Sequence, residues 1–484
     1  MKPKSILMPA LLLLVLIFSA GVSAQTTEKQ RLIVLTDIEA DPDDSQTLVR
    51  LLLYSNQIDI EGLIATTSVH QKNRVAPETI RKIITGYGKV QPNLLKHEPG
   101  YPSAPDLLSL VKQGLPVYGM EGVGKGKDSE GSEWIIKILE REDKRPVWVS
   151  VWGGPNTLAQ ALWKIKETRN EKDAKRLIEK IRVYTISDQD DSGVWMRKSF
   201  PDLYYIVSPG SYANATWSAI NRVVKGISNE EISNEWIAMN IQQDHGPLGA
   251  LYPDVAYGME GDTPSWLMLI PNGLNNPGHP EWGGWGGRYE LYQPDPPSAP
   301  VNPRFTGGVP VEPETRPIWT NVSDKYSPYI PNKFGKAVRR DTAVFTGNHV
   351  TLWRWREDFQ NDFAARIDWC TMTYEEANHP PVPKVNGPEE FTVKSGEIFK
   401  LDADGTYDPD GDNLNFLWFQ YPEAGTFKTP AGFGFLAENL YNVHTITAPQ
   451  VDAPRTIHFI LKVTDKGTPV LSRYKRVIVT VNPK

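Results

Sequence analysis

The first half of the chain alternates between short apolar runs and longer segments in which apolar residues recur every three or four positions. Residues 32–35 form the first run, and residues 45–54 follow with Leu48, Leu51 and Leu52 on one helical face. Continuous apolar runs are typical of buried parallel strands, whereas the longer period is typical of amphipathic helices. The other segments of these two kinds are predicted strands at 58–65, 147–152, 181–186 and 204–207 and predicted helices at 77–84 and 156–166. This alternation predicts an α/β domain with an open, mostly parallel sheet and helices on both faces.

The pattern changes in the second half of the chain. From about residue 271 to 331, Gly, Pro and Trp dominate, which predicts either a functional loop or a structural flap over the sheet. Residues 349–369 show a helical pattern again, and the Pro-rich residues 379–387 are predicted to be a linker. Beyond them, residues 388–484 contain short segments with a period of two, separated by turns. This predicts a C-terminal all-β, Ig-like sandwich.

The N-terminus has the pattern of a cleavable signal peptide. Lys2 and Lys4 precede an apolar run of about ten residues, and Val22-Ser23-Ala24 is a small-residue cleavage pattern. We therefore expect residues 1–24 to be removed from an exported protein, periplasmic or extracellular, whose N-terminal domain covers residues 25–378. The apolar run is too short to span a bilayer, so no membrane anchor is expected.

Composition narrows the classes of partner. The formal net charge is −6 and the chain has no basic stripe, so a nucleic acid polymer is not an expected partner. The single Cys370 excludes an internal disulfide. The chain has 15 Trp residues, more than an ordinary share. Trp faces can stack on sugar rings, although most Trp in any protein packs in the core.

Five carboxylates lie close together at the end of the first predicted strand, in the segment Thr36-Asp-Ile-Glu-Ala-Asp-Pro-Asp-Asp44. Two like charges about 4 Å apart cost about 4 kcal/mol at an effective dielectric of about 20, whereas a helix N-terminus returns only about 0.3–2 kcal/mol. Converging carboxylates therefore need a bound cation, or some must stay protonated. Ca²⁺ suits carboxylate and carbonyl ligands and is the expected cofactor. The alternative is that Asp43 or Asp44 caps the helix and the other acids face solvent.

This acid segment resembles the opening motif of nucleoside hydrolases, in which a strand ends in Asp-x-Asp-x-x-x-Asp-Asp. Aligning the final pair on Asp43 and Asp44 puts Asp37 and Glu39 at the two earlier acids. Further segments similar to that family are Ile64-Ala-Thr-Thr-Ser68, Gly154-Pro-Asn-Thr-Leu-Ala159 and Asp244-His-Gly-Pro-Leu248. The resemblance implies an open α/β sheet and cleavage of N-glycosidic bonds with bound Ca²⁺.

A subgroup is more similar still: the secreted nucleoside-hydrolase-like proteins known as a cellulose-binding family, which carry a C-terminal β-domain. The matching segments are Asp41-Pro-Asp-Asp44, Trp152-Gly-Gly-Pro155, Ser187-Asp-Gln-Asp-Asp191, His245-Gly-Pro-Leu-Gly-Ala-Leu-Tyr-Pro253, Glu260-Gly-Asp-Thr-Pro264 and Trp285-Gly-Gly-Arg-Tyr289. They span most of the N-terminal domain. The resemblance implies a glycoside or polysaccharide as the ligand.

The resemblance also implies a role for each matching residue. Asp43 would contact the sugar hydroxyls, Glu39 would deprotonate water, and His245 would donate a proton to the leaving group. The implied metal ligands are Asp37, Glu39, Asp44 and the carbonyl of Thr157. Gly246 stands where the hydrolases have a further Asp ligand. The missing ligand would come from Asp244, Glu260 or Asp262.

Other residues are candidates for sugar contacts. Asp188 and Asp191 follow one predicted strand and His70 follows another, so all three are expected at the carboxyl edge of the sheet, where Gln189 could contribute too. A solvated turn and a surface histidine are the alternative interpretations. The remaining candidates are Trp282, Trp285 and Arg288, for which core packing is an equal alternative. In the β-domain, residues 408–412 resemble the turn of cadherin-like and polycystic-kidney-disease-type modules, where Ca²⁺ is one option.

Two functions are carried forward. The first is a glycosidase in which carboxylate-bound Ca²⁺ activates water against an anomeric carbon. The second is a non-catalytic protein that binds cellulose or another polysaccharide on a hydrolase-like scaffold, which the missing acid at Gly246 favours. A phosphatase with Asp37 as nucleophile fits less well, because Glu39 and the Asp43–Asp44 pair depart from its motif.

Overall fold

The computed structural model describes residues 28–209, 212–214, 216–295, 309, 312–331, 338–340, 343–429 and 442–484. The predicted signal peptide at residues 1–24 lies outside these residues. Within them, no helix has both the length and the apolar character needed to cross a membrane.

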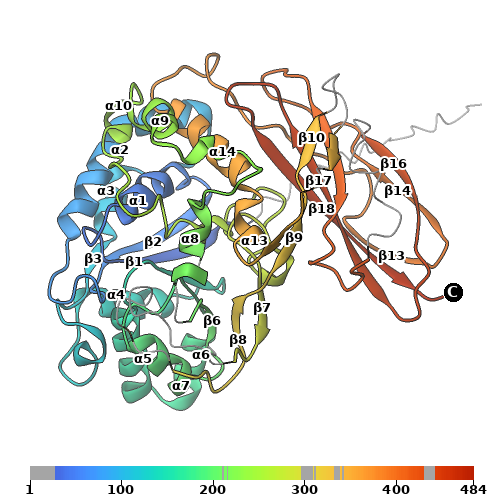
Figure 1. Cartoon of the computed structure of the whole chain (residues 1–484). Coiled ribbons are helices and arrows are strands. Elements are labelled where there is room, and N and C mark those ends of the chain that lie inside the picture. Colours follow the sequence, from blue (N-terminus) through green and yellow to red (C-terminus); the bar gives the residue numbers. More distant parts are fainter. Residues whose placement is uncertain are drawn as a thin grey trace, which may run out of the picture.

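An eight-stranded sheet forms the centre of the N-terminal domain, in the order β3-β2-β1-β4-β5-β6-β8-β7 (Figure 1). The strands are β1 (Gln30–Thr36), β2 (Ile58–Ala65), β3 (Val111–Gln113), β4 (Val147–Val151), β5 (Ile181–Thr185), β6 (Tyr204–Ile206), β7 (Tyr289–Tyr292) and β8 (Ile318–Asn321). Neighbours pair in parallel except for β7, which is antiparallel to β8. The predicted open, mostly parallel sheet is confirmed. The strand order departs in opposite directions from β1 and β4, so their carboxyl ends flank a switch point where such sheets bind ligands.

Helices cover both faces of this sheet (Figure 1). Leu32 and Val34 of β1 pack into one core cluster, whereas Ile33 and Leu35 pack into another on the opposite face. The first cluster takes side chains from α1 (Asp43–Leu53), α2 (Pro77–His97) and α14 (Arg356–Asp368). The second takes them from α4 (Glu130–Leu139), α5 (Asn156–Thr168) and α7 (Ser192–Ser199). Shorter elements are α3 (Ala104–Ser109), α6 (Glu171–Ile178), α8 (Thr216–Ile220), α9 (Asn234–Ile237), α10 (Gly246–Gly249), α11 (Pro264–Leu267) and α13 (Val350–Trp353), with single turns η1 (Gly119–Gly122), η2 (Tyr212–Asn214), η3 (Glu230–Ile232), η4 (Ala238–Gln242) and η5 (Pro280–Trp282).

The C-terminal domain is built of β-strands, as predicted. One sheet has the order β13-β18-β17-β15 and a second pairs β14 with β16. The strands are β13 (Glu390–Lys394), β14 (Ile398–Asp402), β15 (Asn415–Gln420), β16 (Val443–Thr447), β17 (Arg455–Thr464) and β18 (Ser472–Asn482). Trp418, fully buried, belongs to the hydrophobic cluster to which both sheets contribute. Two further antiparallel pairs join β9 (Asp324–Tyr326) with β12 (Phe345–Gly347), and β10 (Tyr329–Pro331) with β11 (Val338–Arg340).

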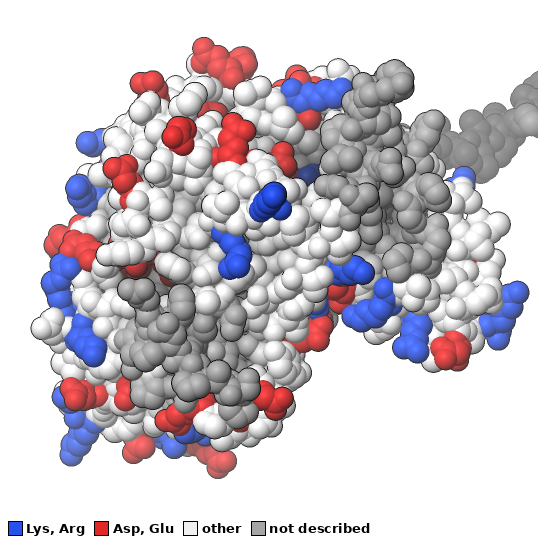
Figure 2. Space-filling model, viewed as in Figure 1, with Lys and Arg blue, Asp and Glu red and all other residues white. Residues whose placement is uncertain are grey.

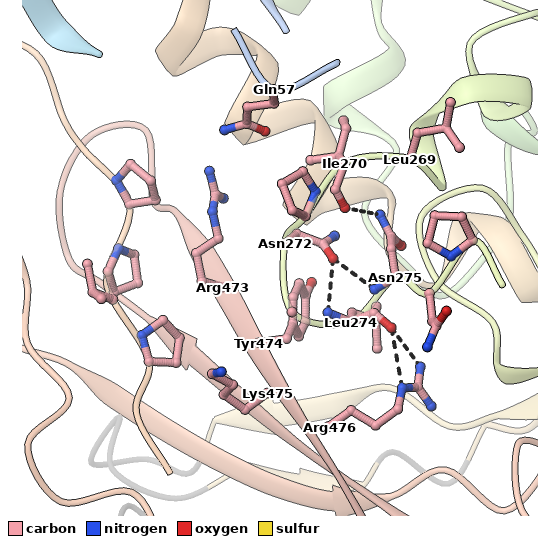
Figure 3. A pocket seen from close by; sticks show the side chains of 18 of the residues that line it. Gln57, Leu269, Ile270, Asn272, Leu274, Asn275, Arg473, Tyr474, Lys475 and Arg476 are labelled. Carbon is pink, nitrogen blue, oxygen red and sulfur yellow. Dashed lines mark hydrogen bonds between the residues drawn. The ribbon is translucent and has the colours of Figure 1, made fainter. Parts of the chain in front are cut away.

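The two domains share a core. Tyr421 and Tyr474 of the β-domain belong to the same buried cluster as Trp285 and Phe359 of the N-terminal domain. Polar contacts reinforce it: Arg476 donates to the carbonyl of Leu274 at 2.8 Å, beside the cleft drawn in Figure 3. The Asp-rich turn at residues 408–412 also contacts the linker, since Asp410 accepts hydrogen bonds from the backbone and the ring of His379. The domain pair is therefore held as one unit.

His458 lies buried in this domain interface, where Arg476 donates to its Nδ1 at 3.1 Å. Burial, aided by the positive charge of Arg476, lowers the pKa of His458 to about 3. A histidine in the unfolded chain titrates near pH 6.5, so between pH 6.5 and 3 the unfolded state binds a proton that the folded state does not. We expect this residue to reduce the free energy of unfolding by up to about 1.4 kcal/mol for each pH unit below 6.5.

Urea unfolding of wild type and His458→Asn at pH 7.5, 6 and 5 measures this effect. Asn keeps an acceptor for Arg476 but does not titrate. The stability gap should move in favour of the variant as the pH falls. A constant gap across the three pH values would contradict the assignment.

Candidate functional site

A pocket of about 650 Å³ lies at the switch point, at the carboxyl ends of β1, β4 and β5. Its lining is made mostly of carboxylates and aromatic rings. The lining residues are Asp37, Ala40, Asp41, Asp43, Asp44, His70, Trp152, Gln189, Tyr212, Trp217, Tyr257 and Asp262. A volume of this size is in the usual range for small-ligand sites.

Three carboxylates from the turn after β1 and from the first turn of α1 converge in this pocket. One oxygen each of Asp41, Asp43 and Asp44 lies within 4.8 Å of the others. The Thr36 hydroxyl donates to Asp44. The Trp217 indole donates to Asp43 at 2.8 Å. Asp41 accepts the backbone N–H of Asp43 at 3.2 Å. Each acid is therefore oriented by a neighbour, and all three stand at the N-terminus of α1, whose dipole favours negative charge there.

Burial changes the protonation of this cluster. Burial raises the pKa of Asp37 to about 7, and a hydrogen bond with the Ser68 side chain opposes part of this rise. Burial also raises the pKa of Asp43 and Asp44 well above the ordinary range, and the negative charges of neighbouring acids add to the shift. Without a cation, the cluster therefore retains protons near neutral pH. The finding agrees with the expectation that a convergent cluster needs either protons or a bound cation.

Asp262 brings a further carboxylate to the pocket from a segment far away in the sequence. Burial, with the charges of Asp43 and Asp44, raises the pKa of Asp262 well above its ordinary range. Its Oδ2 atom is buried and has no hydrogen-bond partner among the described residues. A buried unpartnered oxygen is costly, and native proteins satisfy such groups with a ligand, ion or water. The oxygen donors of this pocket therefore fit a hard cation such as Ca²⁺.

The structure distinguishes the three candidates for the acid missing at Gly246. Glu260 is fully buried, but Arg50 and Tyr252 occupy its oxygens at 2.7 and 2.8 Å. Asp244 is exposed and does not line the pocket. Of the three, Asp262 alone lies in the lining of the pocket that holds the acid cluster.

Close packing of glycines shapes the pocket around these acids. A Cβ atom at Gly153 would lie 2.7 Å from the carboxylate of Asp37. A Cβ atom at Gly261 would lie 1.8 Å from the Trp217 ring and 2.7 Å from Asp43 Oδ2. Glycine is therefore required at both positions for the carboxylates to approach their present places.

Glu39 points away from the pocket, which corrects its predicted role as base and metal ligand. Its backbone has a positive φ of 79°, and its side chain is exposed. Arg74 and Thr79 donate hydrogen bonds to its two oxygens and hold it against α2. Asp41, two residues later, takes a place in the carboxylate cluster instead.

His245 and Thr157 also lie outside the pocket lining. His245 directly precedes α10, and its Nε2 is 2.8 Å from a carboxylate oxygen of Asp368 at the end of α14. Thr157 lies in the first turn of α5, where its hydroxyl contacts that of Thr66 at 3.2 Å. The structure therefore does not bring these two to the acids, contrary to the predicted proton donor and metal contact.

The Asp-rich turn after β5 contributes one side chain to the pocket, Gln189. Asp188 forms a two-pronged ion pair with buried Arg197 at 2.9 and 2.7 Å. Asp191 is exposed and accepts the backbone N–H of Met120 at 2.8 Å. The predicted sugar contacts at Asp188 and Asp191 are thus corrected, because both carboxylates hold loops in place.

The Trp-rich segment packs between the domains and does not face the acids. Trp285 is fully buried, and its ring meets Tyr474 edge-on at 6.4 Å. Arg288 is 3% exposed and is paired with Asp324 at 2.7 Å. Trp282 stacks on His279 at 4.0 Å and meets His458 edge-on. The predicted sugar contacts at Trp285 and Arg288 are therefore corrected to structural roles at the domain interface. Trp282 is partly exposed and lines a cavity between the domains, away from the acids.

Other aromatic side chains, which the sequence analysis did not single out, line the acid pocket. Trp217 and Tyr212 lie 5.8 Å apart, centroid to centroid, and His70 lies 6.0 Å from Tyr212. His70 thus stays a candidate: it lines the pocket, and its Nε2 is 3.1 Å from the Tyr212 hydroxyl. Tyr257 adds an exposed ring. Sequence alone gave no local motif for Tyr212 or Tyr257.

A second cavity, of about 760 Å³, lies between the two domains (Figure 3). The loop around Asn272 and Asn275 forms one wall and Arg473–Arg476 of β18 another. It shares no lining residue with the acid pocket. On the face shown in Figure 2, Lys and Arg side chains are interspersed with Asp and Glu and do not gather in one stripe.

Comparisons with known proteins agree with this arrangement. A family model described as cellulose-binding Sde182, nucleoside hydrolase-like domain, matches residues 31–289. A second, described as cellulose-binding protein Sde0182, C-terminal domain, matches residues 398–481. No curated protein matches the chain.

One solved structure is similar over almost the whole chain. It is a nucleoside hydrolase-related hypothetical protein from Saccharophagus degradans that is associated with carbohydrate metabolism. It has a TM-score of 0.76 and 34% identity and covers 94% of this chain and 100% of its own. The effector protein XOO4466 also matches, at a TM-score of 0.29 and 8% identity over 60% of this chain and 87% of its own, and supports no conclusion. The chain therefore belongs to the cellulose-binding Sde182 family, with its nucleoside hydrolase-like domain followed by the Sde0182 C-terminal domain.

Proposed function

We propose that the acid pocket binds Ca²⁺ and a sugar, and that it hydrolyses a glycosidic bond in a carbohydrate outside the cytoplasm. The observation that carries the proposal is the convergence of Asp41, Asp43, Asp44 and Asp262 in one aromatic-lined pocket. The family's association with cellulose, and the similar protein's association with carbohydrate metabolism, support a saccharide as the ligand.

The same four carboxylates would hold the ion, with Asp37 behind them. A bound Ca²⁺ would supply positive charge that offsets the acids and makes a nearby water more acidic. Asp41 is only partly buried, so it can accept the proton of an attacking water. Asp43, held by Trp217, would accept hydrogen bonds from sugar hydroxyls. The negative charge of the cluster would stabilise the positive charge that develops on the anomeric carbon.

His70 is the histidine in the pocket lining and would pass a proton to the leaving group. Burial lowers the pKa of His70, so its protonated form is favoured on the acid side of neutral pH. His70 replaces His245 in this role, because His245 lies elsewhere. The Tyr212 hydroxyl, 3.1 Å from His70 Nε2, would orient the ring.

The test is a panel of aryl glycosides, nucleosides and β-linked oligosaccharides, assayed with Ca²⁺ and after chelation. We expect turnover that chelation abolishes and Ca²⁺ restores, and a fall in kcat of about 10²–10⁴-fold in Asp41→Asn. Asp254→Asn, an exposed acid outside the lining, is the matched control and should retain activity. If the wild type with Ca²⁺ turns over none of the panel, the hydrolase proposal fails.

A non-catalytic polysaccharide-binding protein is the second candidate. It is favoured by the absence of Glu39 and His245 from the pocket lining. It predicts that the protein is retained on insoluble cellulose without release of soluble sugar. Retention of the Asp41→Asn variant at wild-type strength, together with no turnover by the wild type, would favour this candidate over the hydrolase.

A further inference from the structure

One aromatic ring at the mouth of the acid pocket is almost free of contacts. Tyr257 lines the pocket, yet its residue is 79% exposed. It is the most exposed of the large hydrophobic residues in the described parts of the chain. A single exposed ring is ordinary on a protein surface, so the position of Tyr257 in the pocket lining, and not its exposure alone, makes it a candidate for ligand contact.

The backbone beneath this ring is held firmly. Gly258 packs so closely that a Cβ atom there would lie 2.2 Å from Asn221 and 3.3 Å from the Trp217 ring. The next residues are buried: Met259 is 1% exposed, and Glu260 is fixed by its ion pair with Arg50. The backbone next to Tyr257 is therefore fixed, whereas the Tyr257 side chain is exposed to solvent. This arrangement lowers the entropy cost of binding a ligand against the ring.

The Tyr257 ring also belongs to a set of aromatic side chains that line the pocket beside the carboxylates. Trp217 donates to Asp43 at 2.8 Å and also lies close to Gly258, the residue that follows Tyr257. Tyr212 and His70 extend this set along the pocket. A sugar held by Asp43 and the neighbouring acids would therefore have its next linked unit at the mouth, where Tyr257 stands.

We infer that Tyr257 forms a second saccharide subsite, so that the pocket takes a linked oligosaccharide in preference to a single sugar or a nucleoside. The inference rests on the proposed function, in which the acids hold one sugar. The Tyr257 ring would cover the apolar C–H face of the adjacent unit, which is a contact that a monosaccharide cannot make.

The test is a calorimetric titration of the protein with its acid cluster intact and Ca²⁺ present, using sulfur-linked oligosaccharides that resist hydrolysis so that ligands are not consumed. The probes are glucose, xylose and mannose with their β-1,4-linked dimers and trimers. We expect affinity to rise from monomer to dimer, and Tyr257→Ala to lower dimer affinity about three- to tenfold with monomer affinity unchanged. Tyr257→Phe should retain the gain, because the ring face and not the hydroxyl makes the contact.

Tyr407→Ala, which removes a ring that is 57% exposed on the β-domain, is the matched control and should leave all affinities unchanged. Thermal unfolding should show the same midpoint for Tyr257→Ala and its parent. If the dimer gain survives Tyr257→Ala, or if dimers bind no better than monomers, the subsite is excluded while the sugar site stands. If no probe binds at all, including the monomers, the proposed sugar site itself is overturned.

Discussion

Replacing Asp262 with Asn is expected to weaken Ca²⁺ binding about five- to thousandfold. A carboxylate within about 4 Å of a charge contributes on the order of 1–4 kcal/mol at surface-like to partly buried dielectric values, which gives this range. The metal-free protein should respond in the opposite direction. Asp262 is buried with an unpartnered oxygen, and burial among Asp43 and Asp44 raises its pKa. An Asn side chain at this position carries no charge, so it avoids the cost of burying a carboxylate beside Asp43 and Asp44. The metal-free variant should therefore unfold at a higher temperature than the wild type.

The size of this stability change depends on pH. A carboxyl whose pKa is raised by folding keeps its full contribution only below the pKa of the unfolded chain, and loses it as the pH rises toward the folded value. The advantage of Asp262→Asn without Ca²⁺ should therefore grow from pH 4 to pH 7. Calorimetry for Ca²⁺ and thermal unfolding with and without the ion measure both effects.

Asp254→Asn on the same segment makes an identical chemical change outside the pocket and should alter neither quantity. The result that would sink the assignment is a metal-free Asp262→Asn protein that is less stable than wild type and still binds Ca²⁺ with unchanged affinity. Asp262 would then be a structural acid, and the fourth ligand would have to come from elsewhere.

The sheet and its helices could be predicted from local pattern because burial on both faces leaves a strong signal. The apolar run at 32–35 lies inside β1, and the helix predicted from residue 45 is α1 within two residues of its start. The Gly-, Pro- and Trp-rich segment from about residue 271 to 331 was harder to predict. It supplies β8 and β7, the last two strands on one side of the main sheet, of which β7 is the edge strand. Such short, partly exposed strands have no clear period in the sequence.

The sequence predicted the location of the site more accurately than it predicted the individual residues that form it. Asp43 and Asp44 could be placed because they begin a helix directly after a buried strand. Glu39 and Asp41 both lie in the irregular turn between them, and the direction of each side chain depends on a local φ that sequence does not specify. Arg74 and Thr79, whose contacts hold Glu39 outside, lie about 40 positions away in the chain.

The places of the other site residues depend on contacts between segments that are far apart in the sequence. Asp262 reaches Asp43 across more than 200 residues, through a segment anchored by the buried pair of Arg50 and Glu260. Trp285 and Tyr257 illustrate the same difficulty for aromatic residues. A Trp in a Gly-rich segment and a Tyr in a loop are equally good candidates for a sugar contact on composition alone, and only the placement of the β-domain shows that the first is covered.

Trp285→Ala is expected to reduce the free energy of unfolding by about 3–5 kcal/mol without changing the sugar affinity of the folded protein. The ring is fully buried between the domains, where it lies near Phe359 and Tyr474 and its indole N–H points to the Tyr474 hydroxyl at 3.4 Å. Truncation leaves a cavity at the point where the two domain cores join. Thermal and urea unfolding measure the loss, and titration with a saccharide below the unfolding transition measures affinity.

Two variants make this result specific. Trp285→Phe keeps most of the ring volume and should recover much of the lost stability, since the cost of truncation scales with the cavity left behind. Tyr257→Ala should give the converse result, with stability unchanged and oligosaccharide affinity reduced, because its ring is exposed at the pocket mouth. If Trp285→Ala instead kept wild-type stability and lost sugar binding, the ring would have to be accessible, and the shared core of the two domains would not exist in solution. The two substitutions together thus separate the residue that joins the domains from the residue that meets the ligand.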